Sequence, residues 1–242
     1  MRPVRCPGAA AGDRGQSGKC DHERSQHLGH LRGDRHRGSR SIGRAVARKL
    51  AIGDYAVVIN YLNSQPAADA AVEEILAVNG TAVAVRADVA DELDVERLFG
   101  ETIDAFGGVD VVVHAAARMI LGTVAGYDLQ TFDALHRVNA RGTFVINQQA
   151  SLQLRDGGAI VNFSSSALGL ALPSYAAYAA SKGTVDAITP VLARELSARD
   201  ITVNAIALGL ERPAPADIAN LVAFLVSEDG HWVNGQVIQA SG

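Results

Sequence analysis

The chain has 242 residues, of which 48% are hydrophobic, 20% charged and 5% aromatic. This apolar content argues against a disordered chain, and no run approaches the roughly 18 consecutive apolar residues of a membrane-spanning helix. The two cysteines, Cys6 and Cys20, are too few for a disulfide scaffold, and no apolar signal-peptide core follows Met1. We therefore expect one soluble cytoplasmic domain with no membrane partner.

The first forty residues differ in composition from the rest of the chain. They hold nine of the 22 Lys and Arg residues but four of the 26 Asp and Glu residues, a balance of +5 that leaves −9 for the remainder. Cys20, His22, His27 and His30 lack the paired cysteine spacing of structural zinc sites, so we expect no metal. No aromatic residues or binding motif accompany the basic charge, so we expect a poorly ordered arm over 1–37 and no nucleic-acid partner.

Downstream, helical periodicity alternates with short apolar runs. "SIGRAVARKLA", with its helix start near Ile42, predicts the first helix, and the β-branched run 55–60 predicts a buried strand. Crossovers of this length indicate an α/β fold with a Rossmann-like, doubly wound parallel sheet. The remaining expected helices are 66–79, 91–106, 128–153, 174–198 and 215–228, and the remaining strands are 81–87, 109–114, 158–163, 201–206 and 236–239.

A fold of this kind opens with a strand before the first helix, and here the sequence gives little support for one. The stretch 27–38 has Leu28 and Leu31 as its only apolar side chains. We therefore expect that it supplies no central strand buried on both faces, and the first strand stays uncertain.

The strongest chemical signal is "YAAYAASK" at 175–182, preceded by "NFSSS". Tyr178 and Lys182 are four residues apart on a helix, so the ammonium is expected to favour the ionised phenol and lower its pKa. Such a phenol exchanges a proton with a carbonyl or alcohol oxygen, and the Ser165 hydroxyl can bind the same oxygen. Taken alone, the Tyr and Lys spacing is also that of an ordinary surface pair.

In this context residues 38–242 resemble the short-chain dehydrogenase/reductase family, in its 3-oxoacyl-ACP reductase-like branch. The matching motifs occur in the family's order: "GSRSIGRAVARKLA" (38–51), "VVINY" (57–61), "ADVAD" (87–91), "FGGVDVVVHAAA" (106–117), "VNARGTF" (138–144), "IVNFSSS" (160–166), "YAAYAASK" (175–182), "ITVNAIALG" (201–209) and 215–242. The resemblance implies that Tyr178 is the catalytic acid/base, that Lys182 lowers its pKa and holds the nicotinamide ribose, and that Ser165 orients the carbonyl. It also implies that Asn139 holds a water in a proton relay to the lysine.

The cofactor implied is a nicotinamide dinucleotide, with NADP(H) preferred and NAD(H) possible. NAD-specific folds place a carboxylate at the end of the second strand, where this chain has Asn60, and Arg40 resembles the arginine that binds a 2′-phosphate. Asp88 matches the adenine-amino contact, although it is also interpreted as the cap of the following helix, and Val89 matches the apolar contact on the ring. The other cofactor-binding residues implied are Gly38, Ser39, Ser41, Ile42, Gly43, Ala115, Ala116 and Gly209, together with Tyr178 and Lys182.

The phosphate loop departs from the family pattern Thr-Gly-x-x-x-Gly-x-Gly. The aligned residues are 36–43, in which Arg37 and Ser41 replace glycines and only Gly43 keeps its place. Loss of one base converts Thr-Gly-Gly codons into codons for His36, Arg37 and Gly38. We therefore hypothesise that residues 1 to about 37 are an off-frame translation, which the gene sequence would test.

Two further departures concern the substrate side. "NAIALGLERPAPADIA" runs almost directly into the next helix where relatives carry a helical flap, and "HAAA" (114–117) replaces Asn-Asn-Ala-Gly. The loss of a closing flap weakens water exclusion and specificity.

Two functions remain open from the sequence. The first is an oxidoreductase that transfers a hydride between NADP(H) and a small carbonyl or secondary-alcohol substrate, assembled by resemblance as a homodimer or homotetramer. The alternative is a catalytically impaired or inactive homologue that serves only as an oligomer subunit or is a non-functional product.

Overall fold

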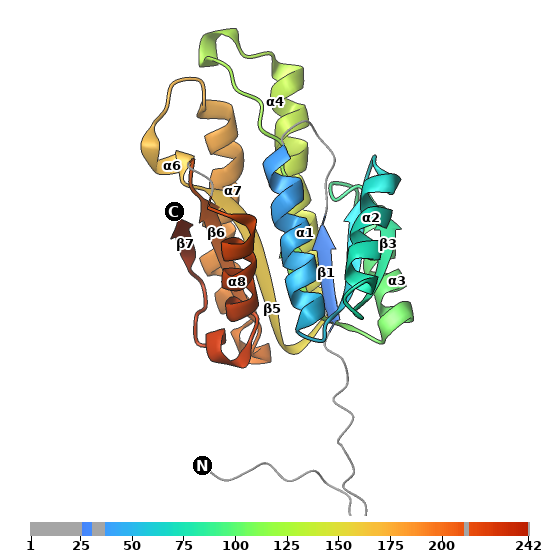
Figure 1. Cartoon of the computed structure of the whole chain (residues 1–242). Coiled ribbons are helices and arrows are strands. Elements are labelled where there is room, and N and C mark those ends of the chain that lie inside the picture. The colour runs from blue at the N-terminus through green and yellow to red at the C-terminus, as the bar shows by residue number, and fades with distance from the viewer. Residues whose placement is uncertain (1–25, 31–36, 211–212, 242) are drawn as a thin grey trace, which may run out of the picture.

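A computed structural model describes residues 26–30, 37–210 and 213–241. A seven-stranded parallel sheet runs through the molecule in the order β3-β2-β1-β4-β5-β6-β7, with helices on both faces (Figure 1). The order reverses between β1 and β4, as in a doubly wound fold, which confirms the predicted class. The strands are Gln26–His30 (β1), Ala56–Tyr61 (β2), Thr81–Arg86 (β3), Val109–His114 (β4), Leu154–Ser165 (β5), Thr202–Leu208 (β6) and Val237–Ala240 (β7).

The helices form two layers, each packed on one face of the sheet. Aliphatic side chains of α1, α2 and α8 pack on one face, and those of α3, α5 and α7 pack on the other. The helices are Arg37–Ile52 (α1), Gln65–Leu76 (α2), Glu92–Phe106 (α3), Leu129–His136 (α4), Gly142–Gln153 (α5), Ala167–Leu170 (α6), Ala176–Glu195 (α7) and Pro215–Leu225 (α8). Shorter turns are Val124–Gly126 (η1), Arg137–Arg141 (η2), Ser197–Arg199 (η3) and Glu228–Gly230 (η4).

The expectation that 27–38 supplies no central strand is wrong. Gln26–His30 pairs in parallel with β2 on one side and with β4 on the other, in the middle of the sheet. Backbone N–H and C=O groups of two neighbouring strands need partners, and a segment between them provides these partners whatever its side chains. Backbone pairing therefore overrides the weak strand preference of this sequence, while residues 1–25 and 31–36 lie outside the described residues.

The first helix also begins earlier than expected. The sequence predicts its start near Ile42, but α1 begins at Arg37. Residues 38–41 therefore have helical backbone. The helix includes both Arg37 and Ser41, the residues that replace glycines of the family's loop. Serine and arginine are compatible with helical dihedrals, whereas the glycines of the family's loop favour a turn.

The expected helix over 128–153 is interrupted by a π turn. It consists of α4, the turn η2 and α5, with Asn139 in the middle of the turn. The hydroxyl of Thr143 donates to the Asn139 carbonyl oxygen at 2.6 Å. A π turn inside a helix commonly marks a functional position. It redirects backbone and side-chain groups, whereas a regular helix would use those backbone groups in its own hydrogen bonds.

The connection from β6 to α8 is short, as the sequence indicates. β6 ends at Leu208 and α8 begins at Pro215, so no helical flap separates them in the described residues 209–210 and 213–214. Within the described part of the chain, no helix has the length and apolarity needed to span a bilayer.

Candidate active site

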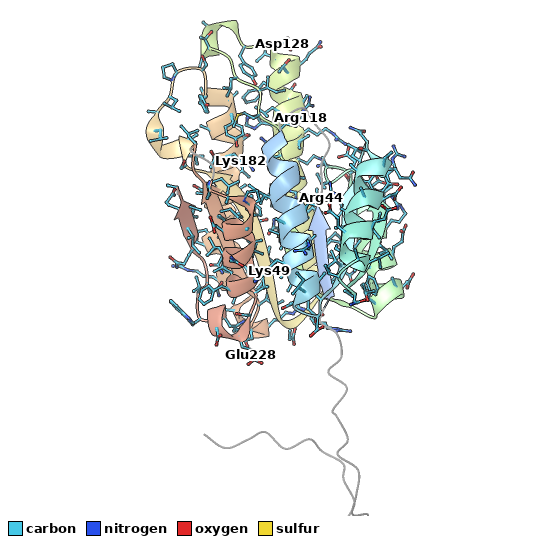
Figure 2. All side chains as sticks on the ribbon, in the orientation of Figure 1. Arg44, Lys49, Arg118, Asp128, Lys182 and Glu228 are labelled. Atoms are coloured by element: carbon cyan, nitrogen blue, oxygen red, sulfur yellow. The ribbon has the colours of Figure 1, made fainter. Side chains whose placement is uncertain are left out.

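Four predicted catalytic residues meet at the carboxyl end of the sheet. Tyr178 and Lys182 lie on α7, Ser165 is the last residue of β5, and Asn139 lies in η2. All four are buried, with relative exposures of 7% for Tyr178, 3% for Lys182, 6% for Ser165 and 0% for Asn139. In Figure 2, Lys182 and Arg118 lie toward the end of the sheet to which β1 points, and Glu228 lies at the opposite end.

The phenol of Tyr178 lies near Ser165 in a buried, largely apolar setting. Burial raises the pKa of Tyr178 above its ordinary 10.0, the hydrogen bond with Ser165 opposes this rise, and the nearby Tyr175 adds to it. The two tyrosine rings meet edge to face at 6.4 Å. The phenol pKa is therefore raised in this structure, because desolvation of the phenolate is the largest effect. That Lys182 lowers this pKa stays a prediction.

The ammonium of Lys182 points into the protein. Its Nζ donates to the carbonyl oxygen of Phe163 at 2.6 Å, two residues before Ser165 on β5. Burial lowers the pKa of Lys182 from 10.5 to about 8, against an opposing effect of Asp186 one turn further along α7. A charge-assisted hydrogen bond thus fixes the lysine to β5, two residues before Ser165.

Asn139 links three parts of the site. Its Oδ1 accepts from the N–H of Arg118 at 2.7 Å, and its Nδ2 donates to the Arg118 carbonyl oxygen at 2.8 Å and to Ser181 Oγ at 2.9 Å. Ser181 Oγ donates in turn to the backbone oxygen of Tyr178 at 2.7 Å. Both amide hydrogens of Asn139 already donate hydrogen bonds, to Arg118 and Ser181. A relay water at this residue can therefore bind only to its oxygen atoms, which are acceptors.

The expected phosphate-binding residues lie at the start of α1. Gly38, Ser39, Arg40 and Ser41 belong to its first turns, and Ile42 packs in the core with an exposure of 8%. A helix N-terminus presents free N–H groups to anions, so this position fits a pyrophosphate. Gly43 follows Ile42 on the same helix and is buried.

Ala115 and Ala116 directly follow β4 at the position where the strand order reverses. Ala116 is 3% exposed, and Ala115 is half-buried. The crevice at such a reversal is the usual dinucleotide site of doubly wound sheets, and small side chains leave room there. The described residues at this edge therefore fit a nicotinamide dinucleotide.

Asn60 is turned toward the sheet. Its Nδ2 donates to the carbonyl oxygens of Val85 at 3.3 Å and Ala87 at 3.0 Å, and the residue is 3% exposed. It therefore joins β2 to the end of β3, and its contact with a ribose stays a prediction. The end of β2 carries no carboxylate, because its last two residues are Asn60 and Tyr61.

Asp88 and Val89 follow β3 at the same edge. Asp88 accepts from the N–H of Ala90 at 3.0 Å and from Arg137 at 2.6 Å. It does not cap α3, because Asp91 is the N-cap whose carboxylate accepts two backbone N–H groups of that helix. Val89 is 4% exposed and packs in the core, where a Cβ on Gly142 would lie 2.9 Å from its methyl group.

Gly209 lies just past β6, where the backbone passes close to the C-terminal strand. Its N–H donates to the Ala240 carbonyl oxygen at 2.8 Å, and a Cβ would lie 2.7 Å from Ser241 Cα. The position therefore requires glycine for packing, and its contact with a cofactor stays a prediction.

Sequence reasoning missed several residues that hold the site together. Ser181, Phe163 and the backbone of Arg118 bind two of the predicted catalytic residues directly, and Arg137 binds Asp88. Ser181 was visible as the residue next to Lys182. The contributions of Phe163 and Arg118 come from backbone atoms, so no residue type could have revealed them.

Comparisons with known proteins agree with this arrangement. A family model described as Enoyl-(Acyl carrier protein) reductase matches residues 38–213. An uncharacterised oxidoreductase of Methylorubrum extorquens is 36% identical over 231 residues, covering 84% of this chain and 93% of that protein.

Solved structures show the same likeness. A short-chain dehydrogenase from Burkholderia cenocepacia in complex with NADP has a TM-score of 0.82 and 32% identity, covering 91% of this chain and 97% of the other. A blue fluorescent protein from a metagenomic library in complex with NADPH has a TM-score of 0.81 and 30% identity, covering 90% and 96% of the two chains. The chain belongs to the short-chain dehydrogenase/reductase family of oxidoreductases.

Proposed function

We propose that the protein is an NADP(H)-dependent oxidoreductase that interconverts a carbonyl group and a secondary alcohol. The observation that carries this proposal is the burial of Ser165, Tyr178 and Lys182 together at the carboxyl end of β5, with Ser165 close enough to affect the pKa of the Tyr178 phenol and the Lys182 ammonium bound to Phe163 on the same strand. Two hydroxyl groups that share one apolar site can bind a single carbonyl oxygen and transfer a proton to it. Bound NADP(H) supplies or accepts the hydride.

Tyr178 acts as the proton donor in the reductive direction. Because burial raises its pKa, the phenol is neutral at physiological pH and carries the proton that the developing alkoxide needs. Ser165 donates a second hydrogen bond to the same oxygen and thereby orients it. In the oxidative direction the phenol must first lose its proton, so that direction is slower near neutral pH.

Lys182 and Asn139 fix this geometry. The Lys182 ammonium is held at the Phe163 carbonyl oxygen, where it stabilises negative charge that develops near Ser165. Asn139 holds Ser181, and through it the backbone of the catalytic helix at Tyr178.

The preference for NADP(H) over NAD(H) is supported by charge at the ribose end of the crevice. No carboxylate stands at the end of β2, where it would repel a 2′-phosphate, and Arg40 lies at the start of α1. The two solved relatives described above contain NADP and NADPH.

A homodimeric or homotetrameric assembly is part of the proposal. Large apolar side chains are exposed on α5 and α7, which lie on the same face of the sheet: Phe144 at 57%, Leu152 at 69% and Val191 at 55%. Apolar groups that gather on neighbouring helices favour burial against a second copy. Light scattering of the purified protein, with a Leu152→Glu variant for comparison, tests the assembly.

The experiment on function separates cofactor binding from turnover. Nicotinamide fluorescence measures the Kd of NADPH and NADH, and absorbance follows NADPH consumption with a panel of small ketones. Tyr178→Phe is expected to bind NADPH within about twofold of wild type and to lose about 100-fold or more in turnover. Tyr55→Phe is the matched control, since its hydroxyl binds Val226 on the opposite side of the fold.

Equal turnover by Tyr178→Phe would refute the assigned proton donor. Tighter binding of NADH than of NADPH would overturn the cofactor preference. If wild type binds neither nucleotide at millimolar concentration, the alternative of an inactive homologue replaces the proposal.

A further inference from the structure

Two arginines tie the turn that carries Asn139 to the segment that follows β3. Arg137 opens this turn, η2, and its Nη1 donates to Asp88 Oδ2 at 2.6 Å. Arg141 closes it, and donates to the Ala90 carbonyl oxygen at 3.0 Å and to Glu92 Oε2. Both ends of η2 are therefore fastened to residues 88–92.

The middle of the same turn reaches the catalytic helix. Asn139 donates to Ser181 Oγ, which lies beside Lys182 on α7. Arg137 is thus not an isolated surface side chain, because its backbone belongs to a turn that is held at three points. Its guanidinium is half exposed, at 46%, whereas the Asp88 carboxylate is 20% exposed.

Hydrogen bonds to both oxygens of Asp88 constrain the plane of its carboxylate. Oδ1 accepts from the N–H of Ala90 and Oδ2 accepts from Arg137. A carboxylate oxygen accepts more than one hydrogen bond, so these two partners do not by themselves exclude a further donor. A carboxylate acceptor binds an N–H donor more strongly than a neutral acceptor does.

We propose that Arg137 is a positioning residue for adenine recognition: it holds Asp88 in the orientation in which the carboxylate accepts from the adenine amino group. This inference rests on the proposed function, because it takes Asp88 as the adenine contact. Arg137 acts through Asp88 and touches neither the substrate nor the reacting atoms.

The test compares NADPH with deamino-NADPH, in which an oxygen replaces the adenine amino group. The nicotinamide fluorescence of both nucleotides reports Kd without turnover. Wild type is expected to bind NADPH about tenfold more tightly, because the analogue leaves the carboxylate facing an acceptor. In Arg137→Gln this preference is expected to fall to about twofold, with partial recovery in Arg137→Lys.

Arg155→Gln is the matched control. Arg155 is similarly exposed, at 41%, and pairs with Asp110 at 3.4 Å at the other end of β4. The Arg155→Gln variant therefore loses the same charge without altering the surroundings of Asp88. Its preference for NADPH over deamino-NADPH should equal that of wild type.

The outcomes separate the inference from the proposed function. A tenfold preference that persists in Arg137→Gln, or an equal weakening of both nucleotides with an unchanged ratio, overturns the role of Arg137 and leaves the oxidoreductase proposal standing. A wild type without preference, but with turnover, refutes the Asp88 contact and the inference with it. Failure to bind either nucleotide refutes both proposals.

Discussion

Replacement of Lys182 by methionine is expected to stabilise the protein while it abolishes turnover. Lys182 is 3% exposed, and the one hydrogen bond described for its Nζ goes to the Phe163 carbonyl oxygen. Methionine has a similar length and volume and carries no charge, so it fills the same space without desolvating an ammonium.

The magnitude follows from the pKa. Burial lowers the pKa of Lys182 from 10.5 to about 8, and each pH unit between these values corresponds to about 1.4 kcal/mol. Burying the ammonium therefore lowers the free energy of unfolding by about 3 kcal/mol at neutral pH. Loss of the hydrogen bond to Phe163 offsets about 1 kcal/mol. We expect Lys182→Met to be more stable by about 2 kcal/mol at pH 7.

The sign of the pH dependence is fixed by the same values. Below pH about 8 the lysine is charged in both the folded and the unfolded chain, and the full cost is present. Between the two pKa values the folded chain binds fewer protons than the unfolded one, so wild type gains stability as pH rises. Above 10.5 both states are neutral and the advantage of the methionine variant disappears.

Urea unfolding of wild type and Lys182→Met at several pH values measures this difference. Lys49→Met is the matched control, because Lys49 is exposed on α1 (Figure 2) and its loss should change stability by less than about 0.5 kcal/mol. A Lys182→Met variant that is less stable than wild type at pH 7, or a difference independent of pH, would refute the reasoning.

Three further outcomes are expected. Because burial raises the pKa of Tyr178 above its ordinary 10.0, carbonyl reduction should be constant around neutral pH, and alcohol oxidation should still be rising at pH 10.0; an oxidation plateau near neutrality would contradict this. Asn147 and Asn162 exchange two amide hydrogen bonds of 3.0 Å, so Asn162→Leu should lower the free energy of unfolding by about 2 kcal/mol, and an unchanged urea midpoint would count against the pair. A Cβ on Gly230 would lie 1.9 Å from a backbone oxygen of α8, so Gly230→Ala should cost about 3 kcal/mol in thermal unfolding, whereas alanine at the unobstructed Gly100 in α3 should not destabilise.

The fold was predictable wherever hydrophobic periodicity decides structure. Strand β4 has the expected bounds, Val109–His114, and the other downstream elements differ mainly at their ends. The central strand β1 was not predictable, because its place depends on the open edges of β2 and β4 rather than on its own side chains. The π turn was hidden for a similar reason, since it depends on Asn139 binding the backbone of Arg118.

The site was predictable in its members and not in its electrostatics. The motif spacing brought Ser165, Tyr178 and Lys182 together correctly. The direction of the Tyr178 pKa shift depends mainly on burial, which a spacing of four residues does not encode. The pairing of Arg137 with Asp88 joins residues 49 positions apart and left no local signal.

The positions of the predicted catalytic residues and of the altered phosphate loop indicate which kinetic constant each would affect. The hydrogen bonds that hold Lys182, Asn139 and the Tyr178 backbone lie wholly within residues 118–182, and each is made in the described structure. The departures from the family's phosphate loop, Arg37 and Ser41, lie at the start of α1. A change confined to the cofactor's phosphate site removes binding that is equal in the ground and transition states, so it raises KM and leaves kcat unchanged. An inactive homologue would instead show a low kcat at saturating NADPH, and these two kinetic patterns distinguish the two functions.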